Sequence, residues 1–417
     1  MSAHERQYTQ PGAGAERAAG AVLHSVNGVS GRVGRPWLVP EFTLGNALLA
    51  CICIVGLYVT VLRFTGGLGS VTALNDNTPW GLWIAFDLMC GVVLGAGRYS
   101  TSTAGYHLLG LKHFYPLVRP SLFSAFIGYA FVLVALSFDM GQPWRSFYPL
   151  LVSPGPTSVL FESAVCISLY LTVLAVQSSP LILSRFGLVS LRRLVDGWSV
   201  PLTIIGLTLF TLHQSSLGGL FLIAPYKMHP LWFSEYLPLY FFVSSLYAGT
   251  AMVIFEGLFV RWFLQPFMTD TEKRWAENVV FALAKASSAI MMSYAAIRLL
   301  GVALEHDWHH LATGYGALFL LEIIGFTMLP ALLLAVASRE HFFYLARWSS
   351  VLAVAGVVLN RFNVCVVAFN YKLPADERYF PAWTEIAFSV FTVSLIVSLY
   401  RFIYPKRSRA TPEESAA

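Results

Sequence analysis

The amino-acid sequence predicts an all-α polytopic membrane protein. Of its 417 residues, 56% are hydrophobic and 12% are charged, whereas a soluble domain has about 25% charged residues. The mean hydropathy is +0.64. The apolar residues fall in repeated blocks of roughly 20 or more, the length at which a helix crosses the hydrocarbon core of a bilayer. This composition excludes a soluble enzyme, a nucleic-acid-binding protein and a disulfide-stabilised scaffold.

Ten apolar segments are separated by breaks that contain proline and glycine. Because backbone polar groups must be satisfied inside a bilayer, each segment is expected to be helical. The segments cover residues 44–65, 80–100, 119–138, 160–180, 199–224, 238–260, 277–302, 314–336, 344–370 and 383–404. We therefore expect a ten-helix transmembrane domain at residues 41–405. A flexible cytoplasmic tail at 1–40, with no apolar block typical of a signal peptide, and a second tail at 406–417 would flank it.

The basic residues predict the orientation of the helices. Of the 27 Lys and Arg residues, 19 are assigned to one side of the membrane, Arg98 among them, and 7 to the other, while Lys285 lies within a segment. The side richer in basic residues is expected to face the cytoplasm, which places both termini there. The net charge of +5 is therefore attributed to the basic residues on the cytoplasmic side and not to an acidic binding partner.

Ionisable side chains within the apolar segments are costly in a bilayer, so each is a candidate functional group. These residues are Asp87, Glu162, His213, Glu256, Lys285, Arg298, Glu322, Arg361 and Glu385. Five of them are expected in the outer half of the membrane, namely Asp87, Glu162, His213, Arg361 and Glu385. Glu256, Lys285 and Glu322 are expected deeper or toward the inner side, where they either relay protons or form buried ion pairs that fix helix register.

His213 is the leading candidate. It opens a run of four polar residues, 213–216, in an otherwise apolar segment. Four successive residues point all around a helix, so some of them must face a cavity, a ligand or another helix. At a rise of about 1.5 Å per residue, His213 lies about 21 Å from the inner end of its segment. Asp87 is expected at a similar depth, and three glycines within the next ten residues allow a helix or a flat ligand to approach closely.

The sequence contains no ligand set typical of haem, iron–sulfur clusters or other metal sites. The cysteines are Cys51, Cys53, Cys90, Cys166 and Cys365, all within apolar segments and outside any CxxC-type motif. Haem b between helices needs two axial histidines at comparable depth, and only His213 is well inside a segment. The histidine cluster at 306–310 lacks an accompanying cysteine or a second ligand motif. We therefore expect no haem, iron–sulfur cluster or metal ion in this chain.

A buried histidine with carboxylates at a similar depth suits the chemistry of a quinone. A quinone ring gains or loses two protons together with two electrons, a histidine exchanges protons near neutral pH, and carboxylates pass them to or from water. The electrons must come from a partner protein, because the chain has no redox ligand set. Two alternative functions are a proton-coupled secondary transporter and a passive membrane anchor whose polar groups only fix helix packing.

Four motifs resemble those of the NrfD/PsrC family of integral membrane subunits, and within it the hydrogenase-2-type (HybB-like) branch. The motifs are residues 77–87 (NTPWGLWIAFD), 212–219 (LHQSSLGG), 360–363 (NRFN) and 380–386 (FPAWTEI). The resemblance implies two four-helix bundles, formed by the second to fifth and the sixth to ninth segments. The first and tenth segments would flank them as peripheral helices.

The resemblance also implies a function. Such a chain is a haem-free subunit of a respiratory oxidoreductase complex in the bacterial inner membrane, reacts with menaquinone or ubiquinone, and is not catalytic alone; its turnover is sometimes coupled to proton translocation. Its expected partners are a periplasmic ferredoxin-like iron–sulfur subunit and either a hydrogenase- or molybdopterin-type catalytic subunit or a multihaem cytochrome. The quinone-binding residues that the resemblance implies are Asp87, Glu162, His213 and Tyr129, and it implies a proton route through Glu256. From their positions we add Trp80, Arg361 and Asn363 as candidates for the quinone site, and Lys285, Glu322 and Glu385 as candidates for the proton pathway.

Overall fold

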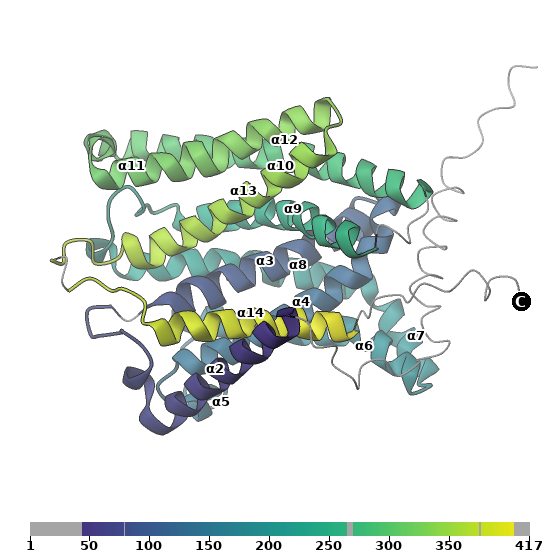
Figure 1. Cartoon of the computed structure of the whole chain (residues 1–417), viewed down its shortest axis with the longest axis horizontal. Coiled ribbons are helices and arrows are strands. Elements are labelled where there is room, and N and C mark those ends of the chain that lie inside the picture. The colour runs from purple at the N-terminus through teal and green to yellow at the C-terminus, as the bar shows by residue number, and fades with distance from the viewer. Residues whose placement is uncertain (1–43, 79, 265–269, 375–376, 404–417) are drawn as a thin grey trace, which may run out of the picture.

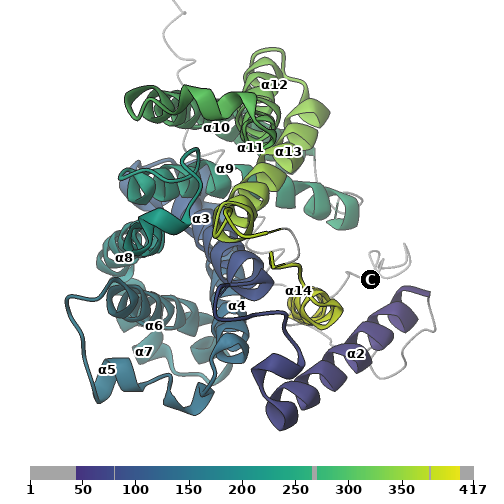
Figure 2. The same ribbon diagram turned by 90° about the vertical axis from the view of Figure 1, so that its left-hand side faces the viewer.

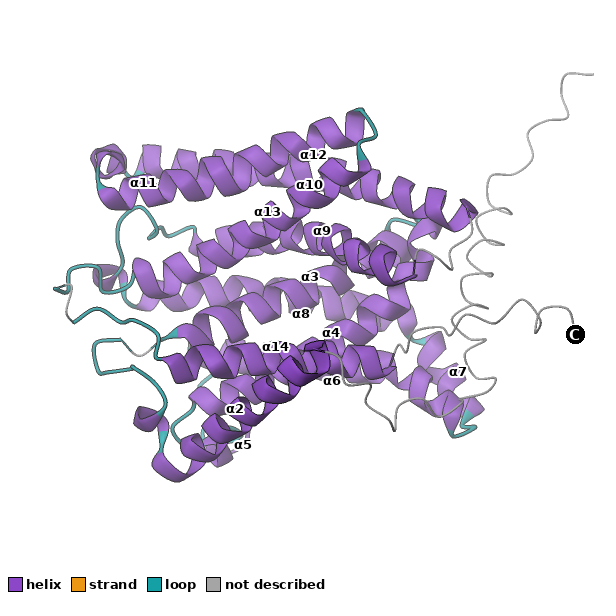
Figure 3. Ribbon diagram, viewed as in Figure 1, coloured by secondary structure: helices purple, strands orange, loops and turns teal. Residues whose placement is uncertain are grey.

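The computed structural model describes residues 44–403, except for residue 79 and residues 265–269 and 375–376. The two tails expected at 1–40 and 406–417 lie outside the described residues. Within the described part, the regular secondary structure is helical and no strand is present, apart from the isolated bridges Asn75–Thr78 and Met228–Phe369 (Figure 3). The predicted all-α class is confirmed.

Helices occupy all ten expected segments. Their bounds are α2 (Leu44–Gly66); η3, α3 and η4 (Trp83–Cys90, Gly91–Thr103 and Ala104–Leu108); α4 (Tyr115–Asp139); α6 (Val159–Arg185); α8 and η7 (Ser199–Gly219 and Leu220–Ile223); α9 (Leu237–Leu264); α10 (Asp270–Leu304); α11, η11 and α12 (Gly314–Leu320, Leu321–Met328 and Leu329–Arg339); α13 and η12 (Phe343–Phe362 and Asn363–Val367); and α14 (Trp383–Ile403). Among the described residues, eight of these helices are long and apolar enough to cross a membrane. Of the other two, α14 has a shorter apolar stretch, Trp383–Leu399, and the second helix is less apolar because it carries Asp87 and Arg98.

Short helices lie in the connections. They are α5 (Tyr148–Leu151), α7 (Val189–Gly197) and the 3-10 turns η2 (Leu68–Ser70), η5 (Lys112–Phe114), η6 (Pro143–Arg145), η8 (Pro225–Lys227) and η10 (Asp307–Ala312). The connections 67–82, 140–158, 224–236, 305–313 and 368–382 gather at one end of the molecule, on the left in Figure 1, which we call the loop-rich end. By the count of basic residues it is the expected outer end.

The long helices form two bundles that share a face. In the first bundle, α3, α4, α6 and α8 pack in sequence, and in the second α9, α10, α12 and α13 do the same. The two bundles meet where α9 packs against α3 and α8, and α2 and α14 pack on each other beside the first bundle (Figures 1 and 2). The predicted pair of four-helix bundles with two peripheral helices is confirmed.

Glycines allow the bundles to meet backbone to backbone. A Cβ on Gly97 of α3 would lie 2.7 Å from the Cα of Gly249 in α9, so a side chain on either residue would force the helices apart. Gly91, on the same helix, faces Val132 of α4 at a similarly short distance. The glycines that follow Asp87 therefore serve close packing of α3 against helices of both bundles.

Wide π-helical turns interrupt several of the long helices. They form η3, η4, η11 and η12, and three predicted site residues fall in them: Asp87 in η3, Glu322 in η11 and Asn363 in η12. A π turn adds a residue to the helix and changes which face the following side chains occupy, and such turns are frequent at functional sites. Sequence periodicity alone therefore mis-assigns the direction of these side chains.

The second helix is longer than expected at its inner end. The sequence predicted a segment that ends at residue 100 and an inner-side position for Arg98, but the helix continues to Leu108 and Arg98 is buried within it. The predicted end of this helix is therefore too early, and Arg98 lies inside the helix, where its guanidinium forms an ion pair with Glu256 of α9. The ion pair with Glu256 compensates the charge of Arg98. The count of basic residues had assumed that Arg98 lies outside the membrane.

Candidate functional site

A buried tyrosine–histidine pair lies inside the first bundle. The hydroxyl of Tyr129, on α4, is 2.6 Å from Nε2 of His213, on α8, and both side chains are fully buried. Nδ1 of His213 lies 2.7 Å from the main-chain oxygen of Leu209, which only accepts hydrogen bonds. Nδ1 therefore carries the proton and Nε2 accepts from Tyr129. The pair holds one exchangeable proton, on the tyrosine, and a basic nitrogen, Nε2 of the histidine, that accepts its hydrogen bond.

A third aromatic residue, Tyr170 of α6, completes this pair. Its ring centroid lies 4.8 Å from that of Tyr129 and 5.3 Å from that of His213. Its buried hydroxyl faces that of Ser100, and within the described part of the chain neither hydroxyl has a partner at normal hydrogen-bond geometry. An unpaired buried hydroxyl is costly unless a ligand or water satisfies it. The sequence analysis did not identify Tyr170, because a single tyrosine in an apolar segment forms no motif. The one feature that could have drawn attention to it is a phenol hydroxyl in the middle of the segment 160–180.

The polar run at 213–216 joins helices rather than lining an open surface. The side-chain amide of Gln214 lies 3.2 Å from Nε2 of His213. Ser216 donates to the main-chain oxygen of His213 and accepts from Ser163 of α6 at 3.1 Å. These bonds hold the His213 ring in one orientation, as an acid–base group requires.

The other residues expected around His213 make different contacts. Asp87 accepts a hydrogen bond from Ser389 of α14 at 2.7 Å and so faces the peripheral helices. Glu162 is exposed at the start of α6, and its side chain has no hydrogen bond or ion pair within the described chain. Trp80 packs edge-on against Phe221 and tilted against Phe369, with ring centroids 5.1 and 5.4 Å apart. The structure thus brings together Tyr129 and His213, but not Asp87 or Glu162 with them.

Arg361 and Asn363 belong to a second polar cluster, inside the second bundle. Its centre is Glu322, whose Oε2 accepts from Trp232 at 2.9 Å and from Asn363 at 2.7 Å. The other oxygen, Oε1, accepts from Asn360 at 2.7 Å, and the Asn360 side-chain oxygen accepts from Arg361 at 2.8 Å. Both carboxylate oxygens are therefore occupied by donors of this chain, which indicates a structural network.

The depth expected for Glu322 is wrong. The sequence placed it deeper or toward the inner side, but it lies eight residues from the loop-rich start of α11 and contacts Trp232 of the connection at that end. Its π-helical turn, η11, directs it toward α13. Arg361 extends the network to α9, because it donates to Ser244 at 2.8 Å and lies over the ring of Phe241.

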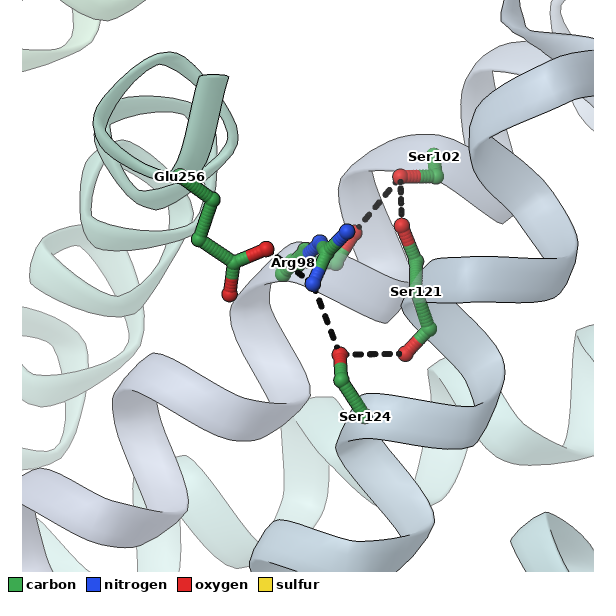
Figure 4. A network of polar contacts seen from close by, with 5 residues as sticks. All are labelled: Arg98, Ser102, Ser121, Ser124 and Glu256. Atoms are coloured by element: carbon green, nitrogen blue, oxygen red, sulfur yellow. Dashed lines mark hydrogen bonds and ion pairs between the residues drawn. The ribbon is translucent and has the colours of Figure 1, made fainter. Parts of the chain in front are cut away.

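The remaining residues of the expected proton pathway lie apart from one another. Glu256 forms an ion pair with Arg98, which also donates to Ser124 at 2.9 Å (Figure 4). Lys285 is exposed on α10, with no hydrogen bond or ion pair to the described residues. Glu385 accepts three hydrogen bonds at the loop-rich end. These residues do not form one continuous file of contacts.

The described residues include no group of three or more His, Cys, Asp or Glu side chains arranged to hold a metal ion. At the loop-rich end the ring of His310 lies edge-on to that of His229, with centroids 5.2 Å apart, and tilted against that of His309, with centroids 3.9 Å apart. The groups that the buried site offers for chemistry are the hydroxyl of Tyr129 and Nε2 of His213, an oxygen and a nitrogen that can exchange a proton.

Fold and site define a polytopic helical membrane protein that buries a proton-exchanging tyrosine–histidine pair in one of two bundles. The chain belongs to the NrfD family, whose model, described as "Polysulphide reductase, NrfD", matches residues 70–371. This confirms the predicted family.

Three relatives align over most of the chain. The chain is 52% identical over 361 residues to a protein of Nitratidesulfovibrio vulgaris, covering 87% of this chain and 93% of the relative. It is 32% identical over 369 residues to the "Probable Ni/Fe-hydrogenase 2 b-type cytochrome subunit" of Escherichia coli, covering 87% and 90%. It is 28% identical over 387 residues to the "Menaquinone reductase, integral membrane subunit" of Nitratidesulfovibrio vulgaris, covering 85% and 90%.

Proposed function

We propose that this chain is the quinone-reactive membrane subunit of a respiratory oxidoreductase complex. The observation that carries the proposal is the fully buried pair of Tyr129 and His213 beside the buried hydroxyl of Tyr170, which has no partner at normal hydrogen-bond geometry among the described residues. A quinone carbonyl is an acceptor that satisfies this hydroxyl, and the pair supplies an acid and a base at hydrogen-bond distance. The names of the relatives, a hydrogenase subunit and a menaquinone reductase subunit, support the same class.

The proposed reaction moves two electrons and two protons. In quinone reduction, each carbonyl oxygen gains one proton and the ring gains two electrons, which yields the quinol. Tyr170 donates a hydrogen bond to one carbonyl oxygen, and Tyr129 gives its proton to the other. Water supplies the second proton and restores the proton of Tyr129, because the neutral ring of His213 has no proton on Nε2 to give, and the partner supplies the two electrons. In quinol oxidation the direction reverses: Nε2 of His213 takes one hydroxyl proton through Tyr129, the second proton passes to water, and two electrons leave to the partner.

The partner must bring its redox centre near the loop-rich end. We infer a periplasmic iron–sulfur subunit, linked to a hydrogenase-type or other catalytic subunit, that exchanges electrons with menaquinone or ubiquinone at this end. The orientation with both termini in the cytoplasm, in a bacterial inner membrane, follows from the distribution of basic residues. Tyr129 is part of the quinone site in this proposal, whereas Arg361 and Asn363 support the second bundle.

The test is His213→Ala in the intact complex, with Ser215→Ala as matched control. Ser215 lies in the same polar run but makes no hydrogen bond to the described residues. We expect quinone-coupled turnover to fall by on the order of 10²-fold or more in the histidine variant, while electron transfer from the catalytic subunit to an artificial dye is unchanged. The control keeps both activities.

Two outcomes would contradict the proposal. One is full quinone-coupled turnover in His213→Ala. The other is solute transport by the purified chain in vesicles without any redox partner, which is the behaviour of a secondary transporter. Assembly of the complex is checked by size-exclusion chromatography, so that a loss of turnover is not assigned to a missing subunit.

A further inference from the structure

Buried polar side chains continue from the tyrosine–histidine pair toward the inner end of the first bundle. The ring centroid of Tyr99, on α3, lies 6.2 Å from that of Tyr170. The hydroxyl of Tyr99 donates to Oε1 of Gln177 on α6, and Nε2 of Gln177 donates to Oγ1 of Thr203 on α8 at 3.3 Å. Thr203 donates to the main-chain oxygen of Ser199, the first residue of α8, at 2.7 Å. We call Tyr99, Gln177 and Thr203 the inward path.

The inward path leads to the end opposite the loop-rich end. There α6 ends, α8 begins, and α7 lies in the connection between them, on the right in Figure 1. Tyr99 and Thr203 are fully buried, whereas Gln177 and Ser199 are partly exposed. His213 lies ten residues beyond Thr203 on α8, or about 15 Å at the rise of a helix. The path therefore covers the inner half of the bundle.

Two hydroxyls on α3 are left without a partner in this region. Thr101 and Ser102 each donate to the main-chain oxygen four residues earlier, at 2.9 Å, as Ser and Thr in helices commonly do. Ser100 and Thr103, on the same helix, do not. Both are buried, and neither hydroxyl has a partner at normal hydrogen-bond geometry among the described residues. Their hydroxyls are therefore available to another group.

These two hydroxyls lie beside the tyrosines. That of Ser100 faces Tyr170, and that of Thr103 faces Tyr99. With the hydroxyl of Tyr170, three buried hydroxyls in this part of the described chain have no partner at normal geometry. A buried hydroxyl without a partner is costly, and ordered water commonly satisfies such groups. The arrangement therefore indicates bound water between α3 and α6.

From this arrangement we propose that water bound between α3 and α6, together with the inward path, exchanges protons between Tyr170 and the inner side of the membrane. Water and hydroxyl groups pass protons along hydrogen bonds. Gln177 is a positioning residue, because its amide accepts from Tyr99 and donates to Thr203 and so holds both hydroxyls in place.

The use of these protons rests on the proposed function. Each quinone that is reduced takes two electrons from the partner at the loop-rich end and two protons, which arrive over the inward path. Each quinol that is oxidised releases two protons by the same route and two electrons to the partner. The route does not include Glu256, whose carboxylate forms an ion pair with Arg98.

The bound water is tested without quinone, by hydroxyl-radical labelling of the purified chain in lipid nanodiscs followed by mass spectrometry. Radicals formed from water by X-rays modify the side chains that this water contacts. We expect Tyr99 and Tyr170 to be labelled several times faster than Tyr247, an equally buried tyrosine of the second bundle. Thr103→Val should slow the labelling of Tyr99, whereas the matched control Thr101→Val should not. Labelling of Tyr99 and Tyr170 as slow as that of Tyr247 would overturn the bound water.

The side from which the protons come is tested with the intact complex in lipid vesicles, with the catalytic subunit outside and a pH-sensitive dye enclosed. The enclosed solution then faces the inner end. Quinone reduction should make it more alkaline, and quinol oxidation should make it more acidic. Gln177→Leu should slow this pH change and quinone-coupled turnover by on the order of 10-fold or more, while dye-linked activity is unchanged. Gln177→Glu, which keeps an acceptor for Tyr99, should restore most of both rates.

Two results would overturn the inward path. One is normal quinone-coupled turnover with no pH change in the enclosed solution, which would show that the protons come from the loop-rich end. The other is an unchanged pH change in Gln177→Leu. Neither result removes the quinone site, which is tested separately by His213→Ala, so failure of the path and failure of the quinone function are distinguishable.

Discussion

Replacing Glu322 by glutamine tests whether the second polar cluster is structural. In the native chain one carboxylate oxygen accepts from Trp232 and Asn363, and the other accepts from Asn360. A glutamine side chain has a single oxygen. If this oxygen takes the place of Oε2, it keeps the hydrogen bonds from Trp232 and Asn363. Its amide NH2 group then faces the NH2 group of Asn360, so one bond is lost and two donors oppose each other.

The size of the effect follows from these contacts. Each hydrogen bond to a charged group contributes about 1.5–3 kcal/mol, and a buried donor left unpaired adds a penalty of similar size. Glu322→Gln also removes the acceptor that orients Asn360, whose side-chain oxygen accepts from Arg361. We therefore expect Glu322→Gln to lower the free energy of unfolding by about 2–4 kcal/mol, with quinone-coupled turnover of the folded complex within about twofold of normal, since the network does not touch His213.

The assay is reversible unfolding of the purified chain in mixed detergent micelles, followed by tryptophan fluorescence. Glu340→Gln, at an exposed position beside Arg339, is the matched control and should change the free energy of unfolding by less than about 0.5 kcal/mol. A Glu322 variant as stable as this control would refute the network. If Glu322→Gln kept normal stability but lost quinone turnover, Glu322 would instead be part of the reactive site.

Three further predictions follow from the contacts. Glu256→Met leaves the buried guanidinium of Arg98 without its partner and should cost about 3–5 kcal/mol of unfolding free energy, whereas Glu256→Met combined with Arg98→Met should recover most of it; additive losses would show that the two residues are not coupled. Gly249→Ala places a methyl group against the backbone of Gly97 and should cost about 1–3 kcal/mol, while Gly128→Ala, which meets no neighbouring atom, should cost nothing; equal thermal stability of the two variants would contradict the close helix crossing. The pKa of His229, at the loop-rich end, is lowered to about 4, mainly by burial and to a smaller extent by the charge of His310. The unfolded chain therefore binds this proton first, and stability is full above about pH 6.5 and falls between about pH 6.5 and 4. His229→Gln should flatten this part of the curve, and an unchanged slope would rule out His229 as its source.

The helices were predictable because their signals are local. Apolar blocks of membrane length and the breaks between them identify all ten helices, and the basic residues add an orientation. The extent of the second helix was not predictable in the same way. Its inner end carries Arg98, whose partner Glu256 lies on a helix of the other bundle, and only the folded chain shows that the charge is compensated.

The level of His213 along its helix was predictable, whereas the level of Glu322 and the lateral positions of the candidate residues were not. The run of polar residues drew attention to His213, and the structure supplies Tyr129 as its hydrogen-bond partner. Arg361 and Asn363 lie in the same half of the membrane but in the other bundle, and Glu162 is exposed on α6. Depth follows from counting residues along a helix, whereas the direction of a side chain depends on helix packing and on π turns such as η3.

The central claim is that a quinone ring binds at Tyr129, Tyr170 and His213, in the first bundle. The most direct test is labelling of the purified chain in nanodiscs with a photoreactive menaquinone analogue, followed by mass spectrometry of the labelled peptides. The account predicts saturable labelling of peptides from α4, α6 and α8, which competes with menaquinone and is lost in His213→Ala. Labelling confined to α11 and α13 around Glu322, or labelling that does not saturate, would contradict it.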